Sequence, residues 1–519
     1  MGNLNLKDIF IGKTDAKNEF VENSEAEKNT FIQSFLKPDN LVEDDFLQGK
    51  RYFITGLKGT GKTALMRYLG IVAEKEQYAK SAFVLFKSEI GEDERIKIEK
   101  AAEIITRTDG EVSQFKDYEL PWMWFLFRRM INLSEKKGIR LFNDNEKWFK
   151  FKNKVESAIN KTEPSYSLFP KLKHGKVEFE TKVVKGSLDF DSNGVSKKEK
   201  NEIDFVKLVK DCESIFPELS PTGEKLYMFI DELELSLGSR KKYQRDIELI
   251  RDLILAINKF NRIARIHGYG IYCITGIRRE VIAATASAGK EINKPISDFG
   301  ISLRWQQSGG NITEHPLIKI IHKRLMSAES LCNIPNPASE EEVWCRYFPE
   351  KINEKPSQEF ILNKTWYRPR DIIRFLGIAQ QQFPMETSFS QYVIESINKD
   401  YSTECWEEQK EELTAYYSSD DINGMELLLM GLTSPFSLND FNKKCNEIKE
   451  IYGDVEKLLE KRKPADILSD LYAIGVIGNT GEKMRFAFRG DNKILLTHDI
   501  VVHGALWNVL SIQPKNAKK

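Results

Sequence analysis

The sequence predicts an α/β fold in which a parallel β-sheet lies between layers of helices. Three observations support this prediction. A glycine-rich loop at 56–63 stands between an apolar run and a helix-prone stretch. A fully apolar run at 226–230 ends in two acidic residues, and after a long helical stretch another apolar run follows at 270–275. Strands that are apolar along their whole length are typical of parallel sheets covered on both faces.

The glycine-rich loop reads Gly-Leu-Lys-Gly-Thr-Gly-Lys-Thr and matches the phosphate-binding pattern G-x-x-x-x-G-K-[ST] in full. Glycines permit positive φ, so consecutive N–H groups can point at one phosphate, and the following helix adds its positive N-terminal end. The pattern assigns Lys62 to the β- and γ-phosphates and the Thr63 hydroxyl to Mg²⁺. The residues expected to bind the nucleotide are Gly56, Gly59, Thr60, Gly61, Lys62, Thr63 and Ala64.

Length and composition are those of a globular protein with about three domains. The 519 residues include 78 basic and 78 acidic ones, so net charge gives no reason to invoke nucleic acid or a membrane. The six cysteines are widely spaced and form no C-x-x-C pair, which argues against zinc and disulfides. No apolar run is long enough for a membrane helix, and no signal peptide is evident. We therefore expect a cytoplasmic protein.

An inserted module is expected between the second and third strands of the sheet. The second strand is predicted at 82–86, and about 140 residues separate it from the next, more than an ordinary connection requires. The module would occupy about 90–225. Within it the sequence predicts a buried helix at 122–133, short strands at 175–190 and a charged helix at 197–215. A further strand is expected at 300–305, and a helix at about 15–36 would cap the domain.

The acids that follow the 226–230 strand are Asp231 and Glu232. A carboxylate at this place can hold Mg²⁺ through its water shell, which assigns Asp231 to the metal. Glu232 could then orient or deprotonate the water that attacks the γ-phosphate. Strands can also end in solvated acids, but the combination with the glycine-rich loop favours a nucleotide site. No N-K-x-D motif occurs, so ATP is favoured over GTP.

Three further polar residues are candidates for contact with the γ-phosphate. Thr275 ends the next strand and could sense the phosphate, or it could be an ordinary capping residue. Arg278, at the same sheet edge, could offer its guanidinium to the phosphates or form a salt bridge, for example with Glu280. Arg370 follows Pro369 in the first turn of a predicted helix. From there it could reach the phosphate or pair with a local acid.

The C-terminal half changes character. Helices are predicted at 315–326, 340–348, 369–381 and 389–417, and then at 425–432, 438–452 and 465–471. A glycine- and asparagine-containing turn and an alternating strand at 485–489 follow. Helices followed by such a hairpin are typical of a winged helix-turn-helix. The predicted domains are 1–310 for the ATPase domain, 311–418 for a helical lid and 419–519 for a winged helix.

Taken together, these motifs resemble the P-loop NTPases of the ASCE/AAA+-like class. More narrowly, the segments 15–19, 58–65, 229–234 and 368–371 are similar to a bacterial family of P-loop ATPases with members in antiphage and other conflict systems. That family is itself similar to the STAND switch proteins and to archaeal origin-recognition initiators. The resemblance implies ATP and Mg²⁺ as cofactors, Thr275 as a strand sensor and Arg370 as a lid sensor. The resemblance also implies that basic residues of the terminal domain could contact DNA phosphates. These residues are Lys461, Arg462, Lys463, Lys483, Arg485, Arg489 and Lys493.

The function expected from the sequence is an ATP-hydrolysing switch that regulates a partner effector or an assembly in bacterial defence. The protein would assemble into a homo-oligomer or form a complex with an effector protein. One alternative is an initiator or regulator whose binding to DNA through the winged helix is licensed by ATP. A second is a P-loop small-molecule kinase, against which Glu232 and the large helical half argue. Ser-Gly-Gly at 308–310 comes after the acidic strand, which argues against an ABC-transporter signature.

Overall fold

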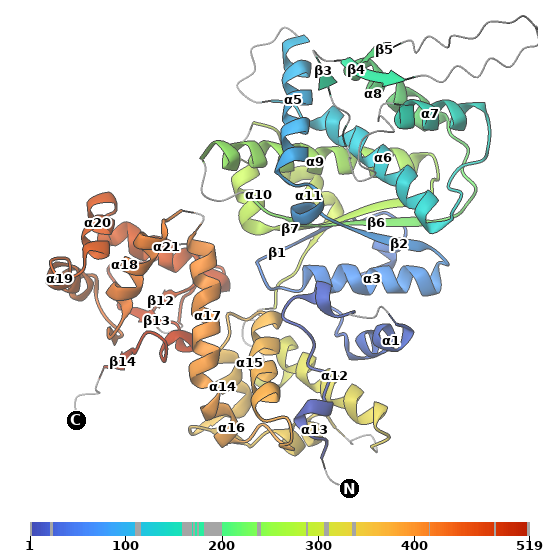
Figure 1. Ribbon diagram of the computed structural model, residues 1–519. Coiled ribbons are helices and arrows are strands. Elements are labelled where there is room, and N and C mark those ends of the chain that lie inside the picture. Colours follow the sequence, from blue (N-terminus) through green and yellow to red (C-terminus); the bar gives the residue numbers. More distant parts are fainter. Residues whose placement is uncertain are drawn as a thin grey trace, which may run out of the picture.

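The structure is a computed structural model, and the residues that it describes form two hydrophobic cores. One core lies in the α/β part, and the other is shared by the helical and C-terminal parts (Figure 1). The residues described are 3–20, 24–108, 116–157, 169, 172–173, 176–180, 200–235, 240–286, 289–305, 311–334, 339–414, 416–481, 484–491 and 493–515.

A five-stranded parallel sheet forms the centre of the first part. Its order is β2-β6-β7-β1-β8, and each neighbouring pair is parallel. The strands are β1 (Phe53–Gly56), β2 (Lys80–Leu85), β6 (Leu226–Leu233), β7 (Ile271–Arg278) and β8 (Gly300–Ser302). The predicted α/β class and the predicted positions of these strands are thus confirmed, and the sheet is compatible with a P-loop-like fold. Because all strands run the same way, the segments that follow β1, β6 and β7 meet at one edge.

Helices cover both faces of this sheet. In Figure 1, α3 (Lys62–Glu76) lies on one face and α9 (Arg240–Ile266) on the other. The glycine at position 70 lets α3 lie close to the strands, because a Cβ there would be 3.3 Å from the Phe229 ring. Two short helices, α10 (Arg279–Ala286) and α11 (Asn293–Phe299), complete the connection from β7 to β8.

Helices and a small antiparallel sheet lie between β2 and β6, where the sequence predicts an inserted module. They are α4 (Phe86–Glu89), α5 (Glu92–Thr108), α6 (Glu119–Lys137), α7 (Glu146–Ser157), β3 (Leu172–Lys173), β4 (Lys176–Glu180), β5 (Lys200–Asp204) and α8 (Phe205–Ile215). The buried helix expected at 122–133 is confirmed as part of α6. The helix expected from 197 is wrong in its first part: residues 200–204 pair with β4, and Asp204 caps a helix that begins only at Phe205. Most of the short strands expected at 175–190 lie outside the described residues.

The helical part and the start of the chain share the second core. Its helices are α12 (Pro316–Leu331), α13 (Glu340–Tyr347), α14 (Ser357–Asn363), α15 (Pro369–Gln382), α16 (Gln391–Ser396) and α17 (Asn398–Leu413). Leu6, Ile9 and Ile11 are buried among them. From there the chain continues through the 3₁₀ turn η2 (Ala16–Asn18), then α1 (Glu25–Ser34) and α2 (Glu43–Leu47). The N-terminal segment therefore runs from the helical core to the edge of the sheet.

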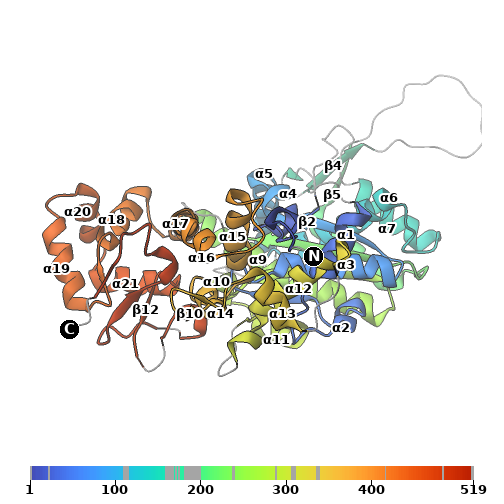
Figure 2. The ribbon, with the colours of Figure 1, turned by 90° about the horizontal axis from the view of Figure 1, so that it is seen from below.

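The C-terminal part lies at one end of the molecule, beside α17 (Figure 2). Its elements are α18 (Ser419–Leu429), β11 (Thr433–Ser434), α19 (Leu438–Ile448), α20 (Gly453–Lys461), α21 (Pro464–Ala473), β12 (Ile477–Asn479), β13 (Ile500–Val502) and β14 (Gln513–Pro514). The strand predicted at 485–489 is wrong: Ala487–Arg489 is a 3₁₀ turn, and only Arg485 makes a bridge, to Asn479. The Phe486 and Phe488 rings stack at 4.9 Å and pack against His503, so tertiary packing overrides the alternating pattern.

Trp366 attaches this end to the helical part. Its ring stacks on His503 with centroids 4.1 Å apart, and its indole N–H donates to the Gly475 carbonyl over 2.8 Å. The imidazole of His503 in turn contacts the Thr365 carbonyl at 3.1 Å. None of the helices in the described ranges is long and apolar enough to cross a membrane.

Candidate functional site

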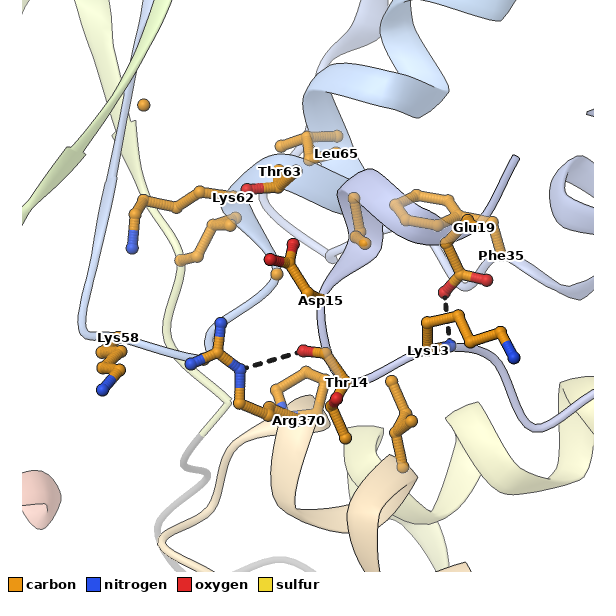
Figure 3. A pocket seen from close by; sticks show the side chains of 18 of the residues that line it. Lys13, Thr14, Asp15, Glu19, Phe35, Lys58, Lys62, Thr63, Leu65 and Arg370 are labelled. Atoms are coloured by element: carbon orange, nitrogen blue, oxygen red, sulfur yellow. Dashed lines mark hydrogen bonds between the residues drawn. The ribbon is translucent and has the colours of Figure 1, made fainter. Parts of the chain in front are cut away.

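A cavity of about 150 Å³ lies at the edge of the sheet where β1 and β6 end. It is enclosed by the glycine-rich loop, the N-terminal segment and helices α12 and α15 (Figure 3). The structure brings Lys62, Thr63, Asp231, Glu232, Arg278 and Arg370 to its wall, from positions far apart in the chain.

The loop between β1 and α3 has the backbone that its glycines permit. Gly59 and Gly61 have φ of 80° and 90°, and Gly61 is the residue that precedes α3. Side chains hold the loop from within and from outside: the Thr60 hydroxyl donates to the Leu57 carbonyl over 2.8 Å, and the Trp305 indole donates to the Thr60 carbonyl over 2.9 Å. A helix N-terminus that follows such a loop presents backbone N–H groups suited to an anion.

Lys62 is folded back onto this loop. Its ammonium donates to the carbonyls of Gly56 (3.1 Å) and Leu57 (2.8 Å), and the side chain is buried. Burial lowers the pKa of Lys62 to about 8, although the nearby Glu280 carboxylate raises it. An anion bound in the loop would favour the charged form of this lysine.

Thr63 and Asp231 join the loop to the end of β6. The Thr63 hydroxyl donates to Asp231 Oδ2 over 2.6 Å, across 168 residues of sequence. Burial raises the pKa of the Asp231 carboxyl, and the bond from Thr63 opposes this. Hydroxyl and carboxylate oxygens are ligands that suit Mg²⁺, so the pair fits the predicted metal. The described residues contain no cluster of three or more His, Cys, Asp or Glu side chains that could hold a metal, so a ligand or water would have to supply the remaining oxygens.

Glu232 has an unusual backbone for its type. Its φ is 59°, at a point where the pairing of β6 with β7 shifts register. Left-handed backbone at a non-glycine residue is strained and is found preferentially at functional sites. The carboxylate accepts from Lys17 Nζ over 2.8 Å, and this bond raises the pKa of Lys17. Lys17 belongs to η2 in the N-terminal segment and is also 3.2 Å from Asp15.

Thr275 and Arg278 are placed differently from Arg370. Thr275 is fully buried, and its hydroxyl donates to the Ile230 carbonyl over 2.9 Å inside the sheet, so it does not line the cavity. Its sensor role stays a prediction that this position does not support. Arg278 lines the cavity, but its guanidinium forms an ion pair with Glu234. Arg278 therefore forms the salt bridge that the sequence allowed as an alternative, but its partner is Glu234 and not Glu280.

Arg370 lies against the loop, in the first turn of α15. The backbone N–H of Arg370 donates to the Gly59 carbonyl over 3.3 Å, and its side-chain Nε donates to the Thr14 carbonyl over 3.1 Å. Its Nη1 donates to Glu408 Oε1 over 3.3 Å. Figure 3 shows the guanidinium between Lys58 and Asp15, directed into the cavity. The acid that pairs with Arg370 lies on α17, so it is not the local partner that the sequence allowed.

The other end of the cavity is apolar and was not foreseen from the sequence. Its lining includes Phe31, Phe35, Leu36, Pro38, Ile320 and Ile373. The charged side chains of Glu19 and Arg324 also line the cavity, and burial raises the pKa of Glu19 and lowers that of Arg324. Glu19 Oε2 and Arg324 Nε and Nη1 are buried and have no hydrogen-bond partner among the described residues. Buried polar atoms usually have partners, so this end suits a partly apolar ligand that carries both donors and acceptors.

The basic residues proposed for DNA contact are largely engaged within the chain. Lys461 pairs with Asp421 at 2.8 Å, and Arg485 is 3.4 Å from Asp491. The Arg489 guanidinium lies 4.8 Å from the Tyr367 ring centroid and donates to its hydroxyl. Arg462 lies over the Tyr417 ring. Lys483 lies outside the described residues.

Comparison with known families places one part of the chain. Residues 315–408 match a family model described as the FunZ-associated C-terminal helical domain. This FunZ-associated segment begins at the residue that caps α12 and ends on α17, so it contains both Arg370 and Glu408. No match was found among curated proteins.

Four residues at the site had no assigned role in the sequence-based prediction. Lys17 and Glu19 lie in the 15–19 segment, whose resemblance to the ATPase family was the available signal. Arg324 and Glu408 lie on helices of the FunZ-associated segment, and no local pattern separates them from other charged helical residues. Only the folded chain brings Glu19 and Arg324 to the cavity, and Lys17 and Glu408 into contact with the lining residues Glu232 and Arg370.

Proposed function

We propose that the chain binds ATP with Mg²⁺ in this cavity and hydrolyses it, and that it acts as a switch. The observation that carries this proposal is the convergence of the glycine-rich loop with the acidic end of β6 through the bond from Thr63 to Asp231. Chance would not be expected to place both motifs, 168 residues apart, on one cavity.

The two ends of the cavity suit the two ends of a nucleotide. The loop, the start of α3 and the cations Lys62 and Arg370 suit a polyphosphate. The apolar end with Phe35 suits a base, whose hydrogen-bonding edge could satisfy the partnerless atoms of Glu19 and Arg324. The site would then enclose the ligand between the sheet edge and the FunZ-associated segment.

The roles of the acidic residues follow from their positions. Thr63 and Asp231 would hold Mg²⁺, whose chemistry is to neutralise charge on the phosphate oxygens. Glu232 would accept a proton from, or orient, the attacking water. Lys17 Nζ lies 2.8 Å from Glu232 Oε1, so the attacking water would have to share the Glu232 carboxylate with this lysine.

The biological setting is proposed from two likenesses. The sequence resembles P-loop ATPases that occur in antiphage and other conflict systems, and residues 315–408 match a FunZ-associated domain. We propose that the switch regulates an effector protein or its own assembly in bacterial defence. The winged-helix alternative has less support, because Lys461, Arg485 and Arg489 are already engaged within the chain.

Calorimetry with ATP and Mg²⁺ tests the proposal. The wild-type chain should bind ATP, and Lys62→Ala should weaken binding by roughly a hundredfold, since a buried charge-assisted contact is lost. Lys75→Ala is the matched control, because Lys75 lies in the last turn of the same helix and bonds only Asn29 among the described residues. Absence of heat with folded wild-type protein, or equal binding by Lys62→Ala, would overturn the proposal.

A further inference from the structure

Four cations converge on one carboxylate beside the cavity. Glu408 Oε1 lies 3.3 Å from Arg370, 3.7 Å from Arg368 and 3.8 Å from Lys58, and Oε2 accepts from Arg374. The Glu408 side chain is only 5% exposed. Burial would raise its pKa, but the guanidinium groups of Arg368, Arg374 and Arg370 hold that pKa well below its usual value. The carboxylate is therefore charged and fixed in place.

These cations come from both sides of the cavity. Lys58 belongs to the glycine-rich loop, whereas the three arginines lie at the start of α15 or on it. Arg368 is itself held by Asp371 at 2.8 and 3.0 Å, and its Nη1 donates to the Lys58 carbonyl over 3.4 Å. Arg374 has a second partner in Glu404 at 3.5 Å. Within this cluster Arg370 is the guanidinium that also lines the cavity.

The contacts of Arg370 leave one part of its guanidinium available. Nε is held by the Thr14 carbonyl and Nη1 by Glu408, whereas Nη2 makes no hydrogen bond to the described residues. A planar guanidinium fixed at two nitrogens has one orientation, so its third nitrogen is aimed without further loss of rotamer freedom. Thr14 supplies a backbone group, so Glu408 is the side chain on which this orientation depends.

We propose that Glu408 is a positioning residue that aims Arg370 at the terminal phosphate and so sets the preference of the site for a triphosphate over a diphosphate. This inference rests on the proposed function, since it assumes that the cavity takes ATP. Glu408 does not touch the ligand itself. It acts through Arg370, and its loss should affect only the ligand that carries the phosphate Arg370 contacts.

The test compares a non-hydrolysable ATP analogue with ADP, both with Mg²⁺, by calorimetry. Glu408→Gln should weaken binding of the analogue by about tenfold or more, as expected for a charge-assisted contact, and change ADP binding less than about twofold. Arg370→Ala should show the same selective loss, and the double variant should lose no more than either single variant. Glu404→Gln is the matched control: it lies one turn away on α17, contacts Arg374 and not Arg370, and should leave both affinities unchanged.

Glu408→Asp keeps the charge and protects the test from misfolding, which circular dichroism would reveal. Its shorter side chain should cause a smaller loss that is again confined to the triphosphate. Equal losses for both nucleotides, no loss, or a loss that adds to that of Arg370→Ala would overturn the inference while leaving the proposed function intact. Failure of the wild-type chain to bind either nucleotide would overturn the proposed function, and this inference with it.

Discussion

The cavity has two walls that are built in different ways. The loop wall consists of residues 56–63 together with Asp231 and Glu232. The helical wall presents Arg370 to the cavity, and we include in it the ion-pair network around Arg370, which consists of Arg368, Asp371, Arg374 and Glu408 and does not itself line the cavity. Backbone geometry shapes the loop wall, through two glycines with positive φ and a helix that begins directly after them. Buried ion pairs shape the helical wall, and each needs a partner from another turn or another helix.

This difference affects what each wall can tolerate. Backbone groups remain when a side chain is replaced. Substitutions in the loop wall should therefore change ATP binding and turnover more than the free energy of unfolding. A buried charge that loses its partner is costly, so substitutions in the helical wall should lower stability as well as change binding. The following experiments are arranged from the largest expected effect to the smallest.

The strongest test of the loop wall is Glu232→Gln. The variant should still bind ATP but lose turnover by roughly a thousandfold, because it removes the group proposed to orient the attacking water. Steady-state phosphate release and calorimetry measure the two properties separately. Glu234→Gln is a matched control, since Glu234 also lines the cavity but is paired with Arg278. Normal turnover by Glu232→Gln would mean that its carboxylate has no catalytic role.

The helical wall is tested by Asp371→Asn. Asp371 is fully buried and binds Arg368 through both oxygens, so neutralising it leaves a buried guanidinium without its main partner. The free energy of unfolding should fall by about 3 kcal/mol or more. Asp400→Asn, at an exposed position on α17, should change it by less than about 0.5 kcal/mol. Denaturant titration compares them, and similar values for both would refute an ionic origin of the wall's stability.

Lowering the pH should reduce the free energy of unfolding through His503, which lies in the C-terminal part of the molecule. Burial lowers the pKa of His503 from 6.5 to about 3, so the folded chain binds fewer protons than the unfolded chain between these pH values. The contribution of His503 to stability is therefore complete above pH 6.5 and declines by about 1.4 kcal/mol per pH unit below it. Unfolding measured at pH 7 and pH 5 should show a smaller difference for His503→Gln than for wild type. His498→Gln, at an exposed site, should retain the wild-type difference.

The smallest effect is expected where the helical wall reaches solvent. Glu411 is 3.4 Å from Lys58, but its side chain is 75% exposed. Exposed ion pairs contribute little, so Glu411→Gln should change stability by less than about 1 kcal/mol and ATP affinity by less than about twofold. Denaturant titration and calorimetry measure both values. A large loss would show that surface charge around Lys58 matters as much as the buried carboxylate of Glu408.

The two walls also differ in how far they could be predicted from sequence. The loop wall follows from local chemistry: glycines, a lysine and a threonine in a fixed pattern, and two acids at the end of an apolar strand. The positions of the five sheet strands followed from the same kind of signal. Glu408 could not be found in this way, because its partners are 34 and 38 residues away on another helix and its own neighbours are mostly charged.

Tertiary contacts also explain where the structure departs from the sequence pattern. The sequence allows Thr275 to sense the phosphate or to be an ordinary capping residue; its hydroxyl bonds Ile230 in the sheet, and no local pattern distinguishes the two orientations. The alternation at 485–489 is real in the sequence, yet the aromatic rings pack against His503 in a turn instead of a strand. The domain boundaries at 310 and 418 stay predictions.

The segment at 366–368 has a mechanical consequence. Trp366 is clamped by His503 and Gly475 of the C-terminal end, and two residues later Arg368 touches the backbone of the glycine-rich loop. So short a stretch cannot absorb much displacement between its two anchors. A shift of α15 relative to the loop must therefore either break the contacts of Trp366 or of Arg368, or move the C-terminal part together with α15.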